Sequence, residues 1–181
     1  MLGKTHIKAG VAISLLLYPN FSHAPISFAC SMAGIMFGSL LVDIDSKNSI
    51  ISKRLNLNHV RSNKSNSANH RSFIHTPMFT ALYTLFMLFL GQLFLAHTIP
   101  KLYNLYYLWV IGTAIGMLGH LFLDSLNPTG IKWLYPLSTK NYKFLSIPVG
   151  TKGELICRLI LNVLIVIALL RCGIITLFAN Y

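Results

Sequence analysis

Acidic residues are scarce in this chain. Only four occur among 181 residues, Asp43, Asp45, Asp124 and Glu154, against 15 lysines and arginines. Charged residues of both signs make up 10% of the sequence, whereas soluble globular proteins carry about 25%. Because 54% of the residues are apolar and many stand in long runs, so little charge excludes an ordinary soluble domain and indicates a membrane protein.

Cysteine is scarce as well. Cys30, Cys157 and Cys172 all fall within apolar runs, their number is odd, and no CxxC spacing occurs. This pattern argues against a disulfide framework and against a thiolate zinc site. Any metal bound by this chain must therefore be held by nitrogen and oxygen ligands.

Five apolar segments run through the chain, at 5–18, 24–42, 77–96, 105–123 and 155–179. The last four are long enough to cross a bilayer core of about 30 Å at about 1.5 Å per residue, but the first is too short to do so unaided. No internal repeat and no soluble domain accompany them. The sequence therefore predicts a single membrane-embedded domain over residues 1–181, an all-α helical bundle with four or five spans.

Two local patterns predict how these helices begin and pack. Thr76 followed by Pro77 is typical of a helix N-cap and first helical position. Small residues, including Gly34 and Gly38, recur along the 24–42 segment, and small residues allow close helix packing in lipid. We therefore expect the 24–42 segment to pack closely in the bundle.

The basic residues lie mainly between the apolar segments. If the 46–69 loop is cytoplasmic, all but Lys101, Arg158 and Arg171 lie at the inner side, as the positive-inside rule favours. The expected location is the cell membrane, multi-pass, with a cytoplasmic N-terminus. The net charge of +11 then reflects loops facing membrane lipid, and we expect no nucleic-acid partner.

The same orientation brings candidate metal ligands from four segments to the inner ends of the helices. His120 and Asp124 are four residues apart and share one helix face. A carboxylate beside an apolar run is unfavourable without a partner. Imidazole and carboxylate ligands together suit zinc, with manganese or iron as alternatives. The predicted ligand set is His6, Asp43, Asp45, His70, His75, His120 and Asp124.

Seven ligands are too many for one tetrahedral ion, so the set fits two ions, or one ion with carboxylates that orient the imidazoles. Simpler interpretations exist for each part. Asp43 and Asp45 are also typical of residues at a membrane boundary. His120 and Asp124 are also typical of a hydrogen-bonded pair within the membrane. The metal site is favoured because all three aspartates of the chain belong to the histidine-rich set.

Three segments carry a family resemblance: 42–45 (VDID), 70–76 (HRSFIHT) and 116–130 (GMLGHLFLDSLNPTG). With the early His6 and in this order, they resemble the bacterial family of inner-membrane metal-dependent hydrolases, some members of which are induced in the SOS response. The family pattern is an early His, then P-D-x-D, H-R-G-x-T-H-S and S-H-x-x-x-D-x-x-T-P-x-G. The chain departs from it, without losing a candidate ligand, at Val42, Ser72, Ile74, Gly119 and Asn127.

The resemblance implies an enzyme, a metal-dependent hydrolase. Its expected substrate is a membrane-resident, lipid-like phosphoester, ester or amide, reached from the cytoplasmic leaflet. Asp43 or Asp45 is the candidate general base, and Arg71 is placed to hold a phosphate or an oxyanion. Glu154 either bonds to the outer shell of the site or favours a helix N-terminus.

A non-enzymatic metal-binding membrane protein or a transporter is the alternative. A transporter needs polar groups near the middle of its spans, and the middles of the last three segments are almost wholly apolar.

Overall fold

The computed structural model describes residues 3–21, 24–45 and 73–179, and the account that follows is confined to them. Their α-helices are α1 (Gly3–Leu17), α2 (Pro25–Leu41), α4 (Pro77–Phe94), α5 (Pro100–Asp124) and α6 (Lys152–Ala179). Three short 3-10 helices accompany them, η1 (Tyr18–Phe21), η2 (Val42–Asp45) and η5 (Phe73–His75). No strand forms in these ranges, so the prediction of an all-α fold is confirmed.

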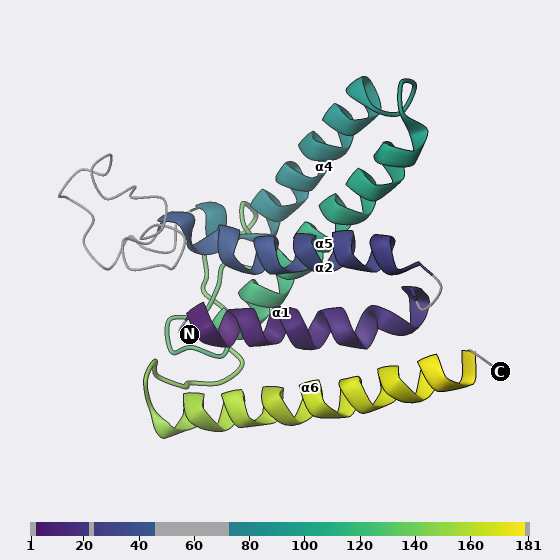
Figure 1. Ribbon diagram of the computed structural model, residues 1–181. Helices are drawn as coiled ribbons and strands as arrows, with labels where there is room; N and C mark the ends of the chain where they lie inside the picture. The colour runs from purple at the N-terminus through teal and green to yellow at the C-terminus, as the bar shows by residue number, and fades with distance from the viewer. Residues whose placement is uncertain (1–2, 22–23, 46–72, 180–181) are drawn as a thin grey trace, which may run out of the picture.

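Four of the described helices are long and apolar enough to cross a membrane. They are α2 extended to Ile44, α4, α5, and α6 as far as Ile175. Helix α1, with 15 residues, is not among them. It continues into η1 and runs antiparallel to α2 (Figure 1). The four candidate spans agree with the predicted range of four or five.

Proline and threonine fix the beginnings of the α4–α5 hairpin. The Thr76 side chain accepts a hydrogen bond from the Phe79 amide at 3.2 Å, with Pro77 in the first turn, so the predicted N-cap is confirmed. Helix α5 begins at Pro100 rather than near residue 105. The early start has a local cause, because proline supplies the φ angle of a first helical turn without needing a hydrogen-bond partner.

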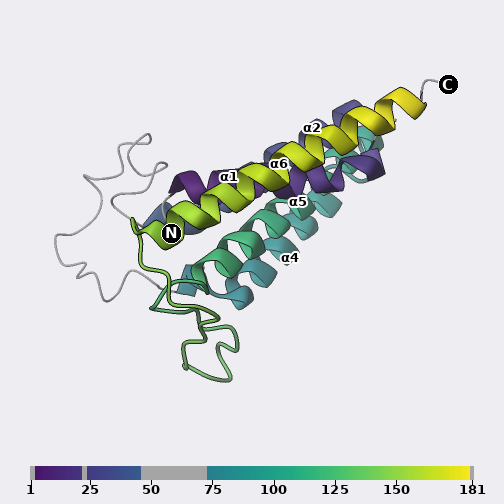
Figure 2. The ribbon, with the colours of Figure 1, turned by 90° about the horizontal axis from the view of Figure 1, so that it is seen from below.

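The helices pack in the order α6, α1, α2, α5, α4 (Figures 1 and 2). The closest pair is α2 with α5, whose backbones touch at glycines four residues apart on each helix. A side-chain atom at Gly38 would overlap the carbonyl of Thr113, and the other three positions are equally closed by facing backbone. These glycines are Gly34 and Gly38 of α2 and Gly112 and Gly116 of α5. The close packing expected of the 24–42 segment is therefore present, and its partner is α5.

One end of the bundle gathers the chain segments that bear the candidate ligands. The start of α1 and the end of α2 lie on the same side, and the α4–α5 hairpin points away from it (Figure 1). Below α5, the 125–151 loop packs back through amide bonds from Phe144 to the Ser125 carbonyl and from Ile147 to the Leu126 carbonyl, both 2.9 Å. The loop thereby closes the apolar core under the candidate site, where Ile131 is buried with Met117.

Candidate metal centre

Five of the predicted ligands converge at this end of the bundle. Two groups of three residues have ligand atoms that all lie within 4.8 Å of one another. One group is His6, His120 and Asp124, and the other is Asp43, His75 and His120. They come from α1, from α5, from η2 after α2 and from η5 before α4. Four segments that are distant in sequence therefore supply one cluster, and His120 belongs to both of its halves.

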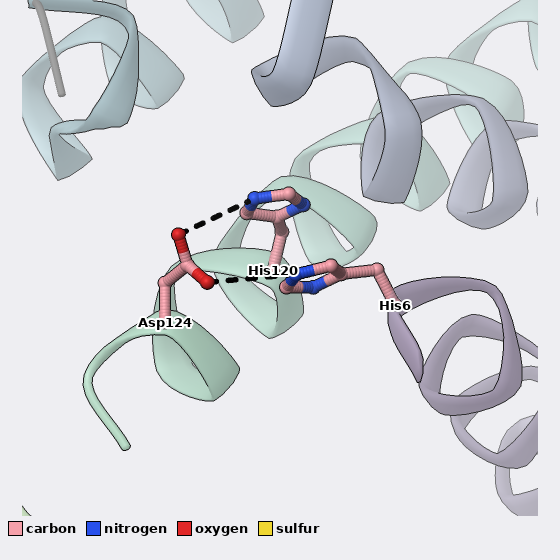
Figure 3. Close-up of side chains that lie close together, drawn as sticks. All are labelled: His6, His120 and Asp124. Atoms are coloured by element: carbon pink, nitrogen blue, oxygen red, sulfur yellow. Dashed lines mark ion pairs between the residues drawn. The ribbon is translucent and has the colours of Figure 1, made fainter. Parts of the chain in front are cut away.

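The spacing of the donor atoms is too long for hydrogen bonds. His6 Nε2 lies 3.5 Å from Asp124 Oδ1, and His120 Nε2 lies 3.8 Å from Asp124 Oδ2 (Figure 3). On the other side, Asp43 Oδ1 is 3.6 Å from His120 Nε2 and 3.7 Å from His75 Nε2. Ligand atoms at about 2.0–2.2 Å from a tetrahedral ion stand about 3.3–3.6 Å from one another. The cluster is close to that spacing.

The tautomer of His120 follows from its contact with the backbone. Its Nδ1 atom lies 2.7 Å from the Ser39 main-chain oxygen. A carbonyl oxygen only accepts, so Nδ1 carries the hydrogen and donates. In the neutral ring, Nε2 then presents a lone pair, and it makes no hydrogen bond to a described residue. A lone pair facing two carboxylates in a buried site is the arrangement that a cation between them would stabilise.

Burial and stacking support neutral rings that act as ligands. His6 and His120 are each 1% exposed, and their rings stack with centroids 3.7 Å apart and an interplanar angle of 10° (Figure 3). Two stacked imidazolium ions at this distance would repel each other in a buried site. Neutral rings avoid this repulsion and leave nitrogen lone pairs for an ion.

The two carboxylates differ in support and in access. Asp124 Oδ1 accepts a 2.9 Å hydrogen bond from the side-chain amide of Asn127, which is itself buried. The Asp124 side chain is 6% exposed, whereas that of Asp43 is 17% exposed. Asp43 is therefore the most accessible carboxylate of the cluster.

Three residues of the predicted site cannot be placed. His70 and Arg71 lie outside the described residues, as does the side chain of Asp45, whose backbone ends η2. Sequence reasoning missed the roles of Ser39 and Asn127. No side-chain signal marks Ser39, because its main-chain oxygen makes the contact. Asn127 had a signal, since it follows Asp124 by three residues next to Pro128.

Comparison with known proteins supplies a family. The model of the YdjM inner membrane protein family matches residues 1–180. The chain belongs to the YdjM inner membrane protein family. No curated protein matches it, and no solved structure does. YdjM membership and the four apolar helices agree in making it a membrane protein. The family description names the inner membrane and does not extend to a metal, a lipid or a hydrolase activity.

Proposed function

We propose that the chain is a membrane-bound metal-dependent hydrolase that acts on a lipid-like phosphoester, ester or amide in the cytoplasmic leaflet. One observation carries the proposal. The lone pair of His120 Nε2, fixed by the bond from Nδ1 to Ser39, faces the carboxylates of Asp43 and Asp124 in a buried site. Such an arrangement is typical of a histidine ligand whose other ring nitrogen donates a hydrogen bond to a backbone carbonyl.

The donor set favours a borderline divalent ion, with zinc first and manganese or iron as alternatives. His120 can serve only one ion, because its second ring nitrogen is engaged with Ser39. In a site with two ions, the carboxylates would therefore have to link the two groups of ligands. Asp124 has the required disposition, with Oδ1 toward His6 and Oδ2 toward His120 (Figure 3).

A divalent ion would supply Lewis acidity and lower the pKa of a bound water from roughly 16 to about 7. The protein's own contribution is positional. His6, His120 and Asp124 form the buried, rigid part of the site. Asp43, on the accessible side, is the candidate general base whose carboxylate accepts a proton from water, with Asp45 as the second candidate. Arg71 is our candidate for holding the charged part of the substrate.

The position of the cluster supports a one-sided site. All five described donors lie near helix ends, whereas the middle of α4 exposes apolar side chains such as Leu85, Phe86 and Phe89. Transporters place their binding sites near the bilayer midplane. A hydrolase that takes its substrate from one leaflet fits an end position better.

The test compares wild-type protein with His120→Ala. Detergent-purified protein is analysed for bound metal and assayed with phospholipids, isoprenoid phosphates and acyl amides in the presence of zinc, manganese or iron. We expect stoichiometric metal and turnover of one class in the wild type, and loss of both in His120→Ala. His97→Ala is the matched control, because His97 is exposed in the connection between α4 and α5. Full metal occupancy without turnover of any substrate would favour the non-enzymatic alternative.

A further inference from the structure

Glu154 is a buried carboxylate on a helix that is otherwise largely exposed. Among the α6 side chains described, up to Ile175, only Glu154 and Ala168 are buried. Glu154 is 0% exposed, although it lies in the first turn of the helix. Burying a carboxylate is unfavourable unless hydrogen bonds compensate. Its partners therefore indicate what this residue does.

Both oxygens of Glu154 have strong donors. Oε1 accepts a 2.8 Å hydrogen bond from the hydroxyl of Thr5, and Oε2 accepts a 2.7 Å hydrogen bond from the Gly150 amide. Thr5 is also fully buried. Gly150 has a φ of 78°, a left-handed conformation that favours glycine. One carboxylate thus fastens the turn before α6 to the first turn of α1.

Thr5 is the residue before His6, and His6 needs this support. His6 is only the fourth residue of α1, which begins at Gly3. The ends of helices fray. Neither ring nitrogen of His6 makes a hydrogen bond to a described residue. His120, by contrast, lies in the last turns of the 25-residue helix α5, and its ring is held by a contact with Ser39. The orientation of the His6 ring therefore depends on the backbone beneath it, on stacking against His120 and on the 3.5 Å contact with Asp124.

We propose that Glu154, acting through the Thr5 hydroxyl, is the positioning residue for His6 in the metal centre, so that α6 is part of the site. The inference rests on the proposed metal site. It assigns Glu154 to the outer shell and makes the first turn of α1 dependent on a contact between residues 149 positions apart.

The test measures zinc affinity of the full chain by competition with a chelator. Thr5→Val removes the hydroxyl at nearly constant shape and is expected to weaken zinc binding about tenfold to a hundredfold, as loss of an outer-shell partner does. Thr5→Ser keeps the hydroxyl and should restore wild-type affinity. A second readout is amide hydrogen exchange of the peptide containing His6, in metal-free protein, which should rise in Thr5→Val.

The matched control is Asn162→Ala, which removes another side-chain hydrogen bond between α1 and α6. There Lys8 Nζ donates to Asn162 Oδ1 at 2.8 Å. We expect this variant to keep both zinc affinity and exchange protection of the His6 peptide. An equal loss in Asn162→Ala and Thr5→Val would show that only helix packing matters and would overturn the positioning role.

Two further outcomes are decisive. Unchanged affinity and exchange in Thr5→Val would also overturn the inference. If the wild type binds none of zinc, manganese and iron but exchange rises in Thr5→Val alone, the support of His6 by Glu154 stands and the proposed function fails. Should Thr5→Val not fold, Glu154→Gln replaces it, with a smaller loss expected because its amide keeps one acceptor oxygen.

Discussion

His120 Nδ1 lies 2.7 Å from the main-chain oxygen of Ser39. That oxygen belongs to the last turn of α2, where carbonyls lack partners within the helix. A single hydrogen bond therefore gives a partner to a carbonyl at the end of one helix and orients a candidate metal ligand on another. The contact is possible because the glycines of α2 and α5 let the two backbones touch just before it.

The first prediction concerns this helix contact. Gly116→Ala should destabilise the protein by about 1–3 kcal/mol, the usual effect of overpacking, because the added methyl overlaps the Ile35 carbonyl. It should also lower metal binding, since Gly116 lies one turn before His120. Thermal unfolding in detergent and metal analysis measure the two effects.

The control for this prediction is Gly173→Ala. A side-chain atom at Gly173 meets nothing within 4 Å, so the change tests helix propensity without a packing conflict. We expect no loss of stability there. If Gly116→Ala were equally harmless, the close approach of α2 and α5 would not hold in the membrane.

The second prediction concerns the ligand set. Single alanine substitutions at His6, Asp43, His75, His120 and Asp124 should each lower the bound metal strongly, because each removes a donor from one cluster. Circular dichroism should show the helices retained. Stoichiometric metal in all five variants would exclude this site.

The third prediction concerns Asn127. Asn127→Leu keeps the approximate size of the side chain but removes the amide donor to Asp124 Oδ1. The carboxylate proposed as a ligand then loses this hydrogen bond. Metal affinity should fall about tenfold or more, as for other outer-shell partners. The measurement is chelator competition, with Asn162→Ala as the distant asparagine control. Equal affinity in both variants would mean that Asp124 is held by other contacts.

The fold was largely predictable because each strong local signal agrees with the global arrangement. Long apolar runs predict α2, α4, α5 and α6, and Thr76 with Pro77 predicts where α4 begins. The error at the start of α5 came from weighing hydropathy alone. Lys101 stands in the first turn of the helix, where a charged side chain is tolerated although it interrupts the apolar run.

Side-chain chemistry and topology predicted part of the site, but they could not predict contacts made by the backbone or by residues distant in the sequence. Alternating spans indicate that His6, Asp43 and His120 share one end of the bundle, and the structure brings them together. The Ser39 carbonyl carries no sequence signal. The bond between Thr5 and Glu154 joins opposite ends of the chain, and no periodic pattern can indicate such a pair.

The fourth prediction concerns orientation. A reporter fused after residue 60 should respond as cytoplasmic, and one fused near Lys101 should respond as external. The reason is the positive-inside rule, since the 46–69 loop is basic and contains no acidic residue. A fusion near Lys140 offers an independent check, expected to be cytoplasmic. An external 46–69 loop would overturn both the orientation and cytoplasmic access to the site.

The last prediction concerns the class of substrate. Arg71 directly follows the predicted ligand His70, so its guanidinium would lie within reach of a bound substrate. Arg71→Lys keeps the charge but loses the planar fork that binds two phosphate oxygens. With a phosphoester substrate, turnover should fall on the order of 100-fold while metal stays bound, by analogy with the loss of one oxyanion donor.

A carboxylic ester or amide develops a single oxyanion and offers no phosphate to clamp, so Arg71→Lys should then lose much less turnover. Arg61→Lys, in the basic 46–69 loop and away from the predicted ligands, is the matched control and should leave turnover unchanged for either class. Steady-state assays of both variants at full metal occupancy therefore test the role of Arg71 and the chemistry of the substrate together. Equal turnover of a phosphoester by the wild type and Arg71→Lys would show that Arg71 does not act in the site.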